Sequence, residues 1–203
     1  MEEKRNLPVL ADLYSDTELK IAQNELNILL NAPPAPAWLK DHPFAKVKKI
    51  VEGRKVDVPA KYIPIERIEW LLTRIFIRWH SEIKTVQLIA NSVVVTIRLH
   101  YQDVVTKEML WQDGVGAVAL QTDQGAGAIE FDKIKSSAVQ MAAPSAETYA
   151  IKDAAEKIGN LFGKDINRST QIDYTNLLNS IPKEDNESKI KEMFEDEPNT
   201  DAK

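Results

Sequence analysis

Basic side chains and one tyrosine are concentrated in a short stretch of the first half of the sequence. Lysine and arginine neutralise phosphates, and a tyrosine ring can stack on a base, so this stretch predicts contact with a nucleic acid strand. The alternative is a solvated hairpin whose charges only keep its edges from aggregating, and charge alone leaves both interpretations open. The candidate residues are Lys46, Lys48, Lys49, Arg54, Lys55, Lys61 and Tyr62.

Residue types that support enzymatic chemistry are sparse by comparison. The chain has no cysteine, and its three histidines lack the spacing of a metal-binding pair. None of its glycines belongs to a recognisable phosphate-binding loop. Carboxylates are plentiful, so a Mg²⁺-dependent nuclease that uses Asp113 and neighbouring acids stays open as an alternative. We expect a non-catalytic binding protein that requires no cofactor.

The elements that must position these residues follow from the periodicity of the apolar side chains. Short connections between the strand-like runs favour an antiparallel meander, and the whole pattern predicts an α+β fold. The expected elements are a basic β-hairpin within 38–59 that turns at Glu52-Gly53, a helix at 64–77, strands at 79–89, 92–101 and 108–120, and a long helix at about 131–162, kinked or divided at Pro144 and capped by Gly163.

Small residues mark the expected contact between the long helix and the sheet. Gly114 and Gly116 lie in the last strand, and the long helix is rich in alanine, so the two elements can approach closely. The four tryptophans have apolar neighbours in the sequence, and we expect them to lie in the core.

Charge divides the chain into three parts. Residues 1–37, with a short helix at 17–31 and a proline-rich linker, have a net charge of −3, and residues 169–203 have a net charge of −5. Residues 38–168 have a net charge of +3 and form the expected core domain. The C-terminal part is expected to be mostly disordered. A polyanion responds to the local field, so the overall charge of −5 does not exclude nucleic acid.

The sequence predicts a protein of the cytoplasm. Its N-terminus is charged with no apolar run behind it, unlike a signal peptide, and no stretch is long and apolar enough for a membrane span. The absence of cysteine is compatible with a reducing compartment.

Two stretches carry a resemblance to a known family. The first is KYIPIERIEWLLTRIF, residues 61–76, and the second is AETYAIKDAAEKIGNLFGKDINR, residues 146–168, in which Thr148, Ile151-Lys152 and the Phe162-Gly163 ending match the pattern of the family's long helix. With the order hairpin, helix, meander and long helix, they resemble the annealing core of the Rad52 family and of related annealing proteins of bacterial viruses. The resemblance covers residues 38–168.

This resemblance implies a ring of identical subunits that holds single-stranded DNA in a groove and anneals complementary strands without ATP, in recombination and repair. It implies that Tyr62 and Lys152 line the groove opposite the basic hairpin. The family has two further basic residues where this chain has Asp153 and Glu156, and Lys157 compensates in part. The acidic tail is a candidate site for a host single-stranded DNA-binding protein. A single-stranded DNA-binding accessory protein without annealing activity is the alternative.

Overall fold

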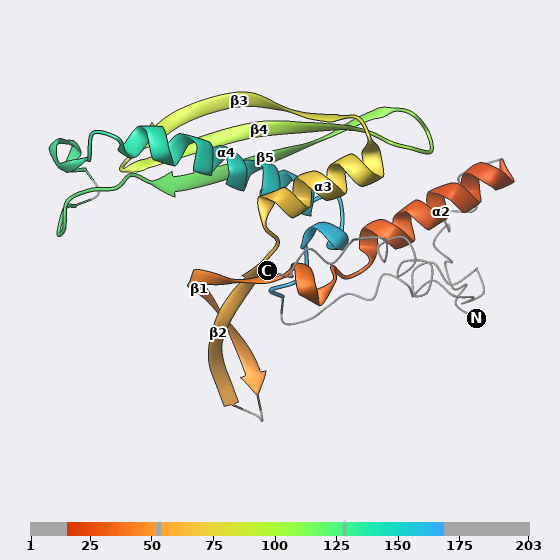
Figure 1. Cartoon of the computed structure of the whole chain (residues 1–203), viewed down its shortest axis with the longest axis horizontal. Coiled ribbons are helices and arrows are strands. Elements are labelled where there is room, and N and C mark those ends of the chain that lie inside the picture. The colour runs from red at the N-terminus through yellow and green to blue at the C-terminus, as the bar shows by residue number, and fades with distance from the viewer. Residues whose placement is uncertain (1–15, 52–53, 128, 169–203) are drawn as a thin grey trace, which may run out of the picture. The chain divides into compact units, whose positions relative to one another are not determined.

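A computed structural model describes residues 16–51, 54–127 and 129–168 (Figure 1). Residues 16–29 belong to one unit and residues 30–168 to another, and the site described below lies within the second unit. The elements are the helices α2 (Thr17–Asn31), α3 (Ile65–Phe76) and α4 (Ala138–Glu156), the 3-10 turns η1 (Pro36–Trp38), η2 (Phe131–Lys133) and η3 (Asn160–Phe162), and the strands β1 (Lys40–Val51), β2 (Arg54–Tyr62), β3 (Trp79–Ile89), β4 (Ser92–Gln102) and β5 (Met109–Ala119).

The strands form two antiparallel sheets, one of β1 and β2 and one in the order β3-β4-β5, which confirms the predicted α+β class, hairpin and meander. The hairpin turn at 52–53, residues 1–15 and the acidic tail at 169–203 lie outside the described residues. Among the helices that the structure describes, none has the length and apolar character to cross a bilayer.

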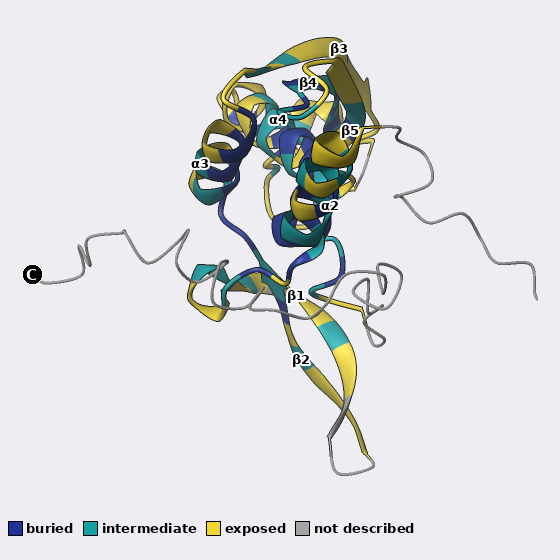
Figure 2. Cartoon of the chain, turned by 90° about the vertical axis from the view of Figure 1, so that its right-hand side faces the viewer, coloured by how far each residue is buried: buried dark blue, intermediate teal, exposed yellow. Residues whose placement is uncertain are grey.

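The core of the second unit lies between the three-stranded sheet and α4. Side chains of β4 alternate between a buried and a half-buried face, as expected for a strand with one face in the core. α4 covers the buried face of β4 and β5, and Figure 1 shows it lying along the sheet. Figure 2, coloured by burial, shows that β3 and the far part of the hairpin are mostly exposed. The buried face of β4 consists of Val93, Val95, Ile97, Leu99 and Tyr101.

The contact between β5 and α4 depends on glycine. A Cβ atom placed on Gly114 would lie 2.0 Å from the carbonyl oxygen of Ala150, and one placed on Gly116 would lie 2.0 Å from that of Ala146. Ala146, Ala150 and Ala154 are fully buried against the sheet. The predicted close packing of small residues is therefore confirmed, because any side chain at these two positions would push the helix away.

α3 joins the hairpin to the three-stranded sheet. Pro64 stands at its N-cap and Glu66 lies in its first turn, where a negative charge is stabilised by the helix dipole. Its buried face ends with Phe76, whose ring lies 4.6 Å from that of Tyr101 and stacks on Phe162 at 6.4 Å. The aromatic cluster fixes α3, β4 and η3 to one another.

The predicted limits of the long helix are wrong at both ends. Residues 131–133 form a separate 3-10 turn, Ile134 pairs with Thr122 in an isolated bridge, and a turn at 136–137 follows, so the helix begins only at 138. Pro144 lies inside α4 without dividing it. At the other end the helix stops at 156, and Gly163, with φ of 104°, closes η3 instead.

The prediction that all four tryptophans lie in the core is also wrong. Trp38, Trp70 and Trp79 are half-buried, and Trp111 is 52% exposed. Trp111 pairs with His100 on the face of the sheet opposite α4, and no described helix covers that face. The guanidinium of Arg98 covers the indole instead, 3.9 Å from the ring centroid.

Candidate nucleic-acid interface

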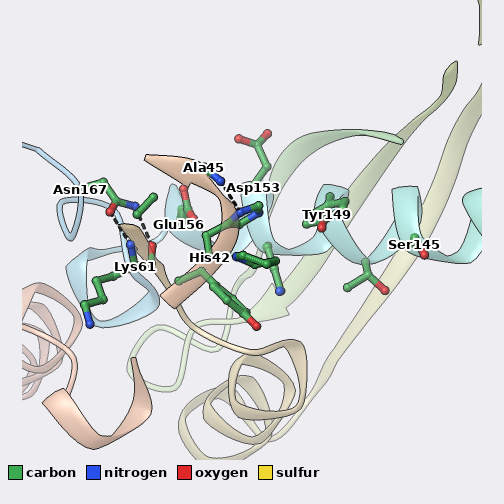
Figure 3. Close-up of a pocket in the computed structure, with 13 residues that line it drawn as sticks. His42, Ala45, Lys61, Ser145, Tyr149, Asp153, Glu156 and Asn167 are labelled. Carbon is green, nitrogen blue, oxygen red and sulfur yellow. Dashed lines mark hydrogen bonds between the residues drawn. The ribbon is translucent and has the colours of Figure 1, made fainter. Parts of the chain in front are cut away.

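A cleft of about 530 Å³ separates the β1-β2 hairpin from α4 (Figure 3). The hairpin supplies one wall and α4 the other, so the two walls come from residues about a hundred positions apart in the chain. Its lining residues are His42, Pro43, Ala45, Ala60, Lys61 and Tyr62 from the hairpin, Ser145, Thr148, Tyr149, Lys152, Asp153 and Glu156 from α4, and Asn167.

Asn167 fastens the base of the hairpin to the body of the protein. The backbone N–H of Lys61 donates to Asn167 Oδ1 at 2.8 Å, and Asn167 Nδ2 donates to the carbonyl oxygen of Lys61 at 2.7 Å (Figure 3). Lys61 Nζ lies 2.6 Å from Asp41 Oδ1 across the hairpin. These bonds hold the end of β2 in place, and with it Tyr62, the next residue.

Lys152 lies between two tyrosine rings on the wall of the cleft. Its ammonium is 4.8 Å from the ring centroid of Tyr62 and 5.7 Å from that of Tyr149. Such cation–π contacts orient the ammonium without neutralising its charge. Burial lowers the pKa of Lys152, while the nearby carboxylates of Glu66 and Glu156 oppose this shift. This part of the cleft wall therefore places the Lys152 cation beside two aromatic rings.

Asp153 and Lys157 are bonded to the edge of β5. Asp153 Oδ2 accepts the backbone N–H of Val115 at 3.0 Å and the Lys157 ammonium at 2.9 Å. Lys157 Nζ also donates to the backbone carbonyl of Asp113. The structure thus directs Lys157 toward β5, and this predicted site residue does not line the cleft.

Glu156 also lines the cleft but has a different environment. No hydrogen bond or ion pair joins its carboxyl group to any residue that the structure describes. Burial raises the pKa of Glu156 to about 7, and the neighbouring Asp153 carboxylate adds to the shift, while Lys152 and Lys157 oppose it. This carboxyl group can therefore gain or lose a proton near neutral pH.

The five predicted basic residues of the hairpin are exposed and lie beyond the cleft on both faces of the two-stranded sheet. Directly paired residues share a face, so the register assigns each one. Lys46, Lys48 and Lys55 lie on the face that also holds Asp57, and Lys49 and Arg54 lie on the opposite face with Val56 and Val58.

Three of the residues predicted from the sequence line the cleft: Lys61, Tyr62 and Lys152. The cleft also contains residues that the prediction missed. Tyr149 precedes Lys152 by three positions and therefore shares its helix face, a signal that could have been used. Asn167 gave no such signal, because its bonds to Lys61 join positions 106 residues apart.

The acids considered for a nuclease are engaged elsewhere. Asp113 accepts two hydrogen bonds from the Arg98 guanidinium, at 2.7 and 2.9 Å, and this contact lowers the pKa of Asp113. Within the described ranges, no three His, Cys, Asp or Glu side chains come close enough together to hold a metal ion.

Comparisons with known proteins assign no family to this chain. No family model matches the sequence. No curated protein matches it either.

Proposed function

We propose that this chain binds single-stranded DNA along the cleft between the hairpin and α4, and that an oligomer of it promotes the annealing of complementary strands without ATP. The observation that carries the proposal is the position of Lys152 between Tyr62 and Tyr149, opposite a lysine-rich hairpin. Ammonium groups bind phosphates, and tyrosine rings give bases a surface on which to stack. The proposal extends the resemblance to the Rad52 family to the geometry of this cleft.

The hairpin supplies the positive charge. Residues 40–62 contain seven basic and three acidic side chains, a net charge of +4, which exceeds the net charge of +3 for the whole of residues 38–168. Long-range attraction of a polyanion is therefore directed to the hairpin. Its basic residues lie on both faces, so we expect them to attract and guide the strand, while the cleft makes the closer contacts.

Oligomer formation is supported by an apolar surface on β3. This strand is at one edge of the sheet, and four of its large apolar side chains are more than half exposed: Ile83, Val86, Leu88 and Ile89. The opposite edge strand, β5, exposes Met109 and Trp111. Two different apolar surfaces on opposite edges are suited to head-to-tail contacts between identical copies, which is the arrangement that closes into rings.

Annealing requires little from the protein beyond holding the strand. A strand held by its phosphates can present bases for pairing, and stacking in the new duplex supplies about 1.4 kcal/mol per base-pair step. Repetition of the cleft around an oligomer multiplies a modest affinity per subunit. No nucleotide hydrolysis enters this scheme.

One assay tests the proposal against its two alternatives. Complementary fluorescent oligonucleotides are mixed with the full chain, with and without Mg²⁺, and both pairing and strand length are followed. We expect faster pairing that does not depend on ATP, with strands of unchanged length. Slower pairing would identify a binding protein that only coats single strands, and shortened strands in Mg²⁺ would identify a nuclease. The absence of any binding to oligonucleotides at low salt would refute the proposal.

A further inference from the structure

We propose that Glu156 couples the binding of DNA phosphate in the cleft to the uptake of a proton, so that the affinity for the strand rises as the pH falls through neutrality. The inference rests on the proposed function and adds to it a regulation of the same site.

The geometry isolates the carboxyl group of Glu156. It follows Lys152 by four positions on α4, a spacing at which a lysine and a glutamate commonly pair. Here the Lys152 ammonium lies instead over Tyr62 and Tyr149. Asp153, the other acid of this wall, is occupied by Val115 and Lys157. Glu156 is thus a carboxyl group on the cleft wall with no hydrogen-bond partner among the described residues.

Several charged or titratable groups surround the same space. On α4 they are Lys152, Asp153, Lys157 and Tyr149, on the hairpin they are Asp41, His42, Lys61 and Tyr62, and on α3 Glu66 acts on Lys152. Of the two acids on the α4 wall, Asp153 is bonded to two donors and Glu156 to none. A phosphate that enters the cleft therefore meets one unneutralised carboxylate.

A bound phosphate favours the protonated form of that carboxyl group. Two negative charges in a half-buried space repel each other strongly, and this repulsion is removed when the carboxylate binds a proton. Once protonated, the group no longer repels phosphate and becomes an O–H donor that a phosphate oxygen can accept. Because the pKa of Glu156 in the free protein is already about 7, this step falls within the range of pH 6 to 8.

The test compares affinity at two pH values. The full chain is titrated onto a fluorescent single-stranded 30-mer at pH 6.0 and pH 8.0 at constant ionic strength. For the natural sequence we expect binding about five- to ten-fold tighter at pH 6.0, the effect of a shift approaching one pKa unit. Glu156→Gln, which mimics the neutral carboxyl group, should bind tightly at both values and lose most of the difference.

Two variants separate Glu156 from other sources of pH dependence. Glu147→Gln removes the same charge from the same helix but outside the cleft, and it should keep the natural ratio of affinities. His42→Gln removes the histidine that lines the cleft. The absolute affinity of this variant can change, but the ratio of its affinities at pH 6.0 and pH 8.0 should stay close to that of the natural sequence. A Glu156→Gln variant that retains the natural ratio would overturn the inference, and so would a His42→Gln variant that abolishes it.

A second measurement needs no variant. Calorimetric titration of the natural chain with the oligonucleotide at pH 7, in two buffers with different ionisation enthalpies, reports the protons taken up on binding. We expect net uptake for each occupied cleft, and no uptake would overturn the inference. Binding without uptake leaves the proposed function standing, whereas no binding at any pH overturns both.

Discussion

At the scale of single residues, the cleft shows what a sequence can and cannot reveal about a binding site. The resemblance predicts Lys152 and Tyr62 as groove residues, and the ammonium of Lys152 lies 4.8 Å from the ring centroid of Tyr62. That Lys157 points to β5 could not be predicted, because its position depends on a backbone carbonyl 44 positions away in the chain. Local spacing therefore predicts candidates, and the packing of distant segments determines which of them share a site.

Lys152→Ala tests the cation of the cleft. We expect the affinity for a single-stranded oligonucleotide to fall several-fold. The plot of log affinity against log salt concentration should become shallower by about 0.7, because one phosphate contact fewer releases fewer counterions. Lys135→Ala removes an exposed lysine from the connector before α4 and serves as the control, with both quantities unchanged. Fluorescence anisotropy between 50 and 300 mM salt provides the measurement, and an unchanged slope for Lys152→Ala would remove this residue from the interface.

Glu156 should also make folding stability depend on pH. Its carboxyl group titrates at about 7 in the folded chain and near 4.5 when exposed, so between these values the folded state binds more protons than the unfolded state. Stability is therefore lost as the pH rises from about 4.5 to 7. Glu156→Gln should unfold like the natural chain at pH 4.5 and be more stable at pH 8 by about 1–2 kcal/mol, less than the full shift because the side chain keeps some contact with solvent. Urea unfolding at the two pH values measures the difference, and equal stabilities at pH 8 would contradict the expectation.

At the scale of elements, the strands were predictable and the ends of the long helix were not. The limits of β3, β4 and β5 lie within one residue of the predicted runs, because alternation along a half-buried strand is a local signal. The start of α4 depends on pairing between Ile134 and Thr122, and on a hydrogen bond from the backbone of Lys135 to that of Gln121. Neither contact leaves a pattern in the residues of the helix itself.

Gly116→Ala tests the packing of α4 on β5. The added Cβ would meet the carbonyl oxygen of Ala146 and the backbone N–H of Ala150, atoms that cannot rotate away. We expect a loss of about 2–3 kcal/mol in the free energy of unfolding. Gly127→Ala is the matched control, because its Cβ would meet only the flexible side chain of Glu130, at 3.5 Å, and its effect should stay within about 0.5 kcal/mol. Similar denaturation midpoints for both variants would show that the helix can move away at little cost.

At the scale of the whole molecule, the two edges of the three-stranded sheet differ. Asp153 and Lys157 occupy backbone groups of β5, whereas none of the described side chains bonds the outer edge of β3. A long, exposed apolar edge strand is a template for association unless something covers it. The proposed oligomer would use this strand. The predicted meander already implies that its first strand lies at an edge, but not that the apolar side chains of this strand stay exposed.

Val86→Lys tests the role of β3 in assembly. Val86 is 57% exposed, so a lysine there should leave the fold intact while introducing a charge into the contact between copies. We expect the mass measured by light scattering to fall toward that of a single chain, and the affinity for oligonucleotides to fall with it because the subunits no longer bind jointly. Ile21→Lys makes the same change at an exposed position of α2 and should leave the mass unaltered. Equal masses for the Val86 variant and the natural chain would exclude this strand from the interface.

The two hydrogen bonds between Lys61 and Asn167 have a consequence for the order of events during synthesis. The hairpin is made early, but the helix that forms the opposite wall and the amide that secures its base are made about a hundred residues later. A nascent polypeptide that has reached only the end of β5 already carries the lysine-rich hairpin but lacks the wall that contains Lys152. The complete cleft can therefore form only after residue 167 has left the ribosome, so contacts that need both walls are made late in synthesis.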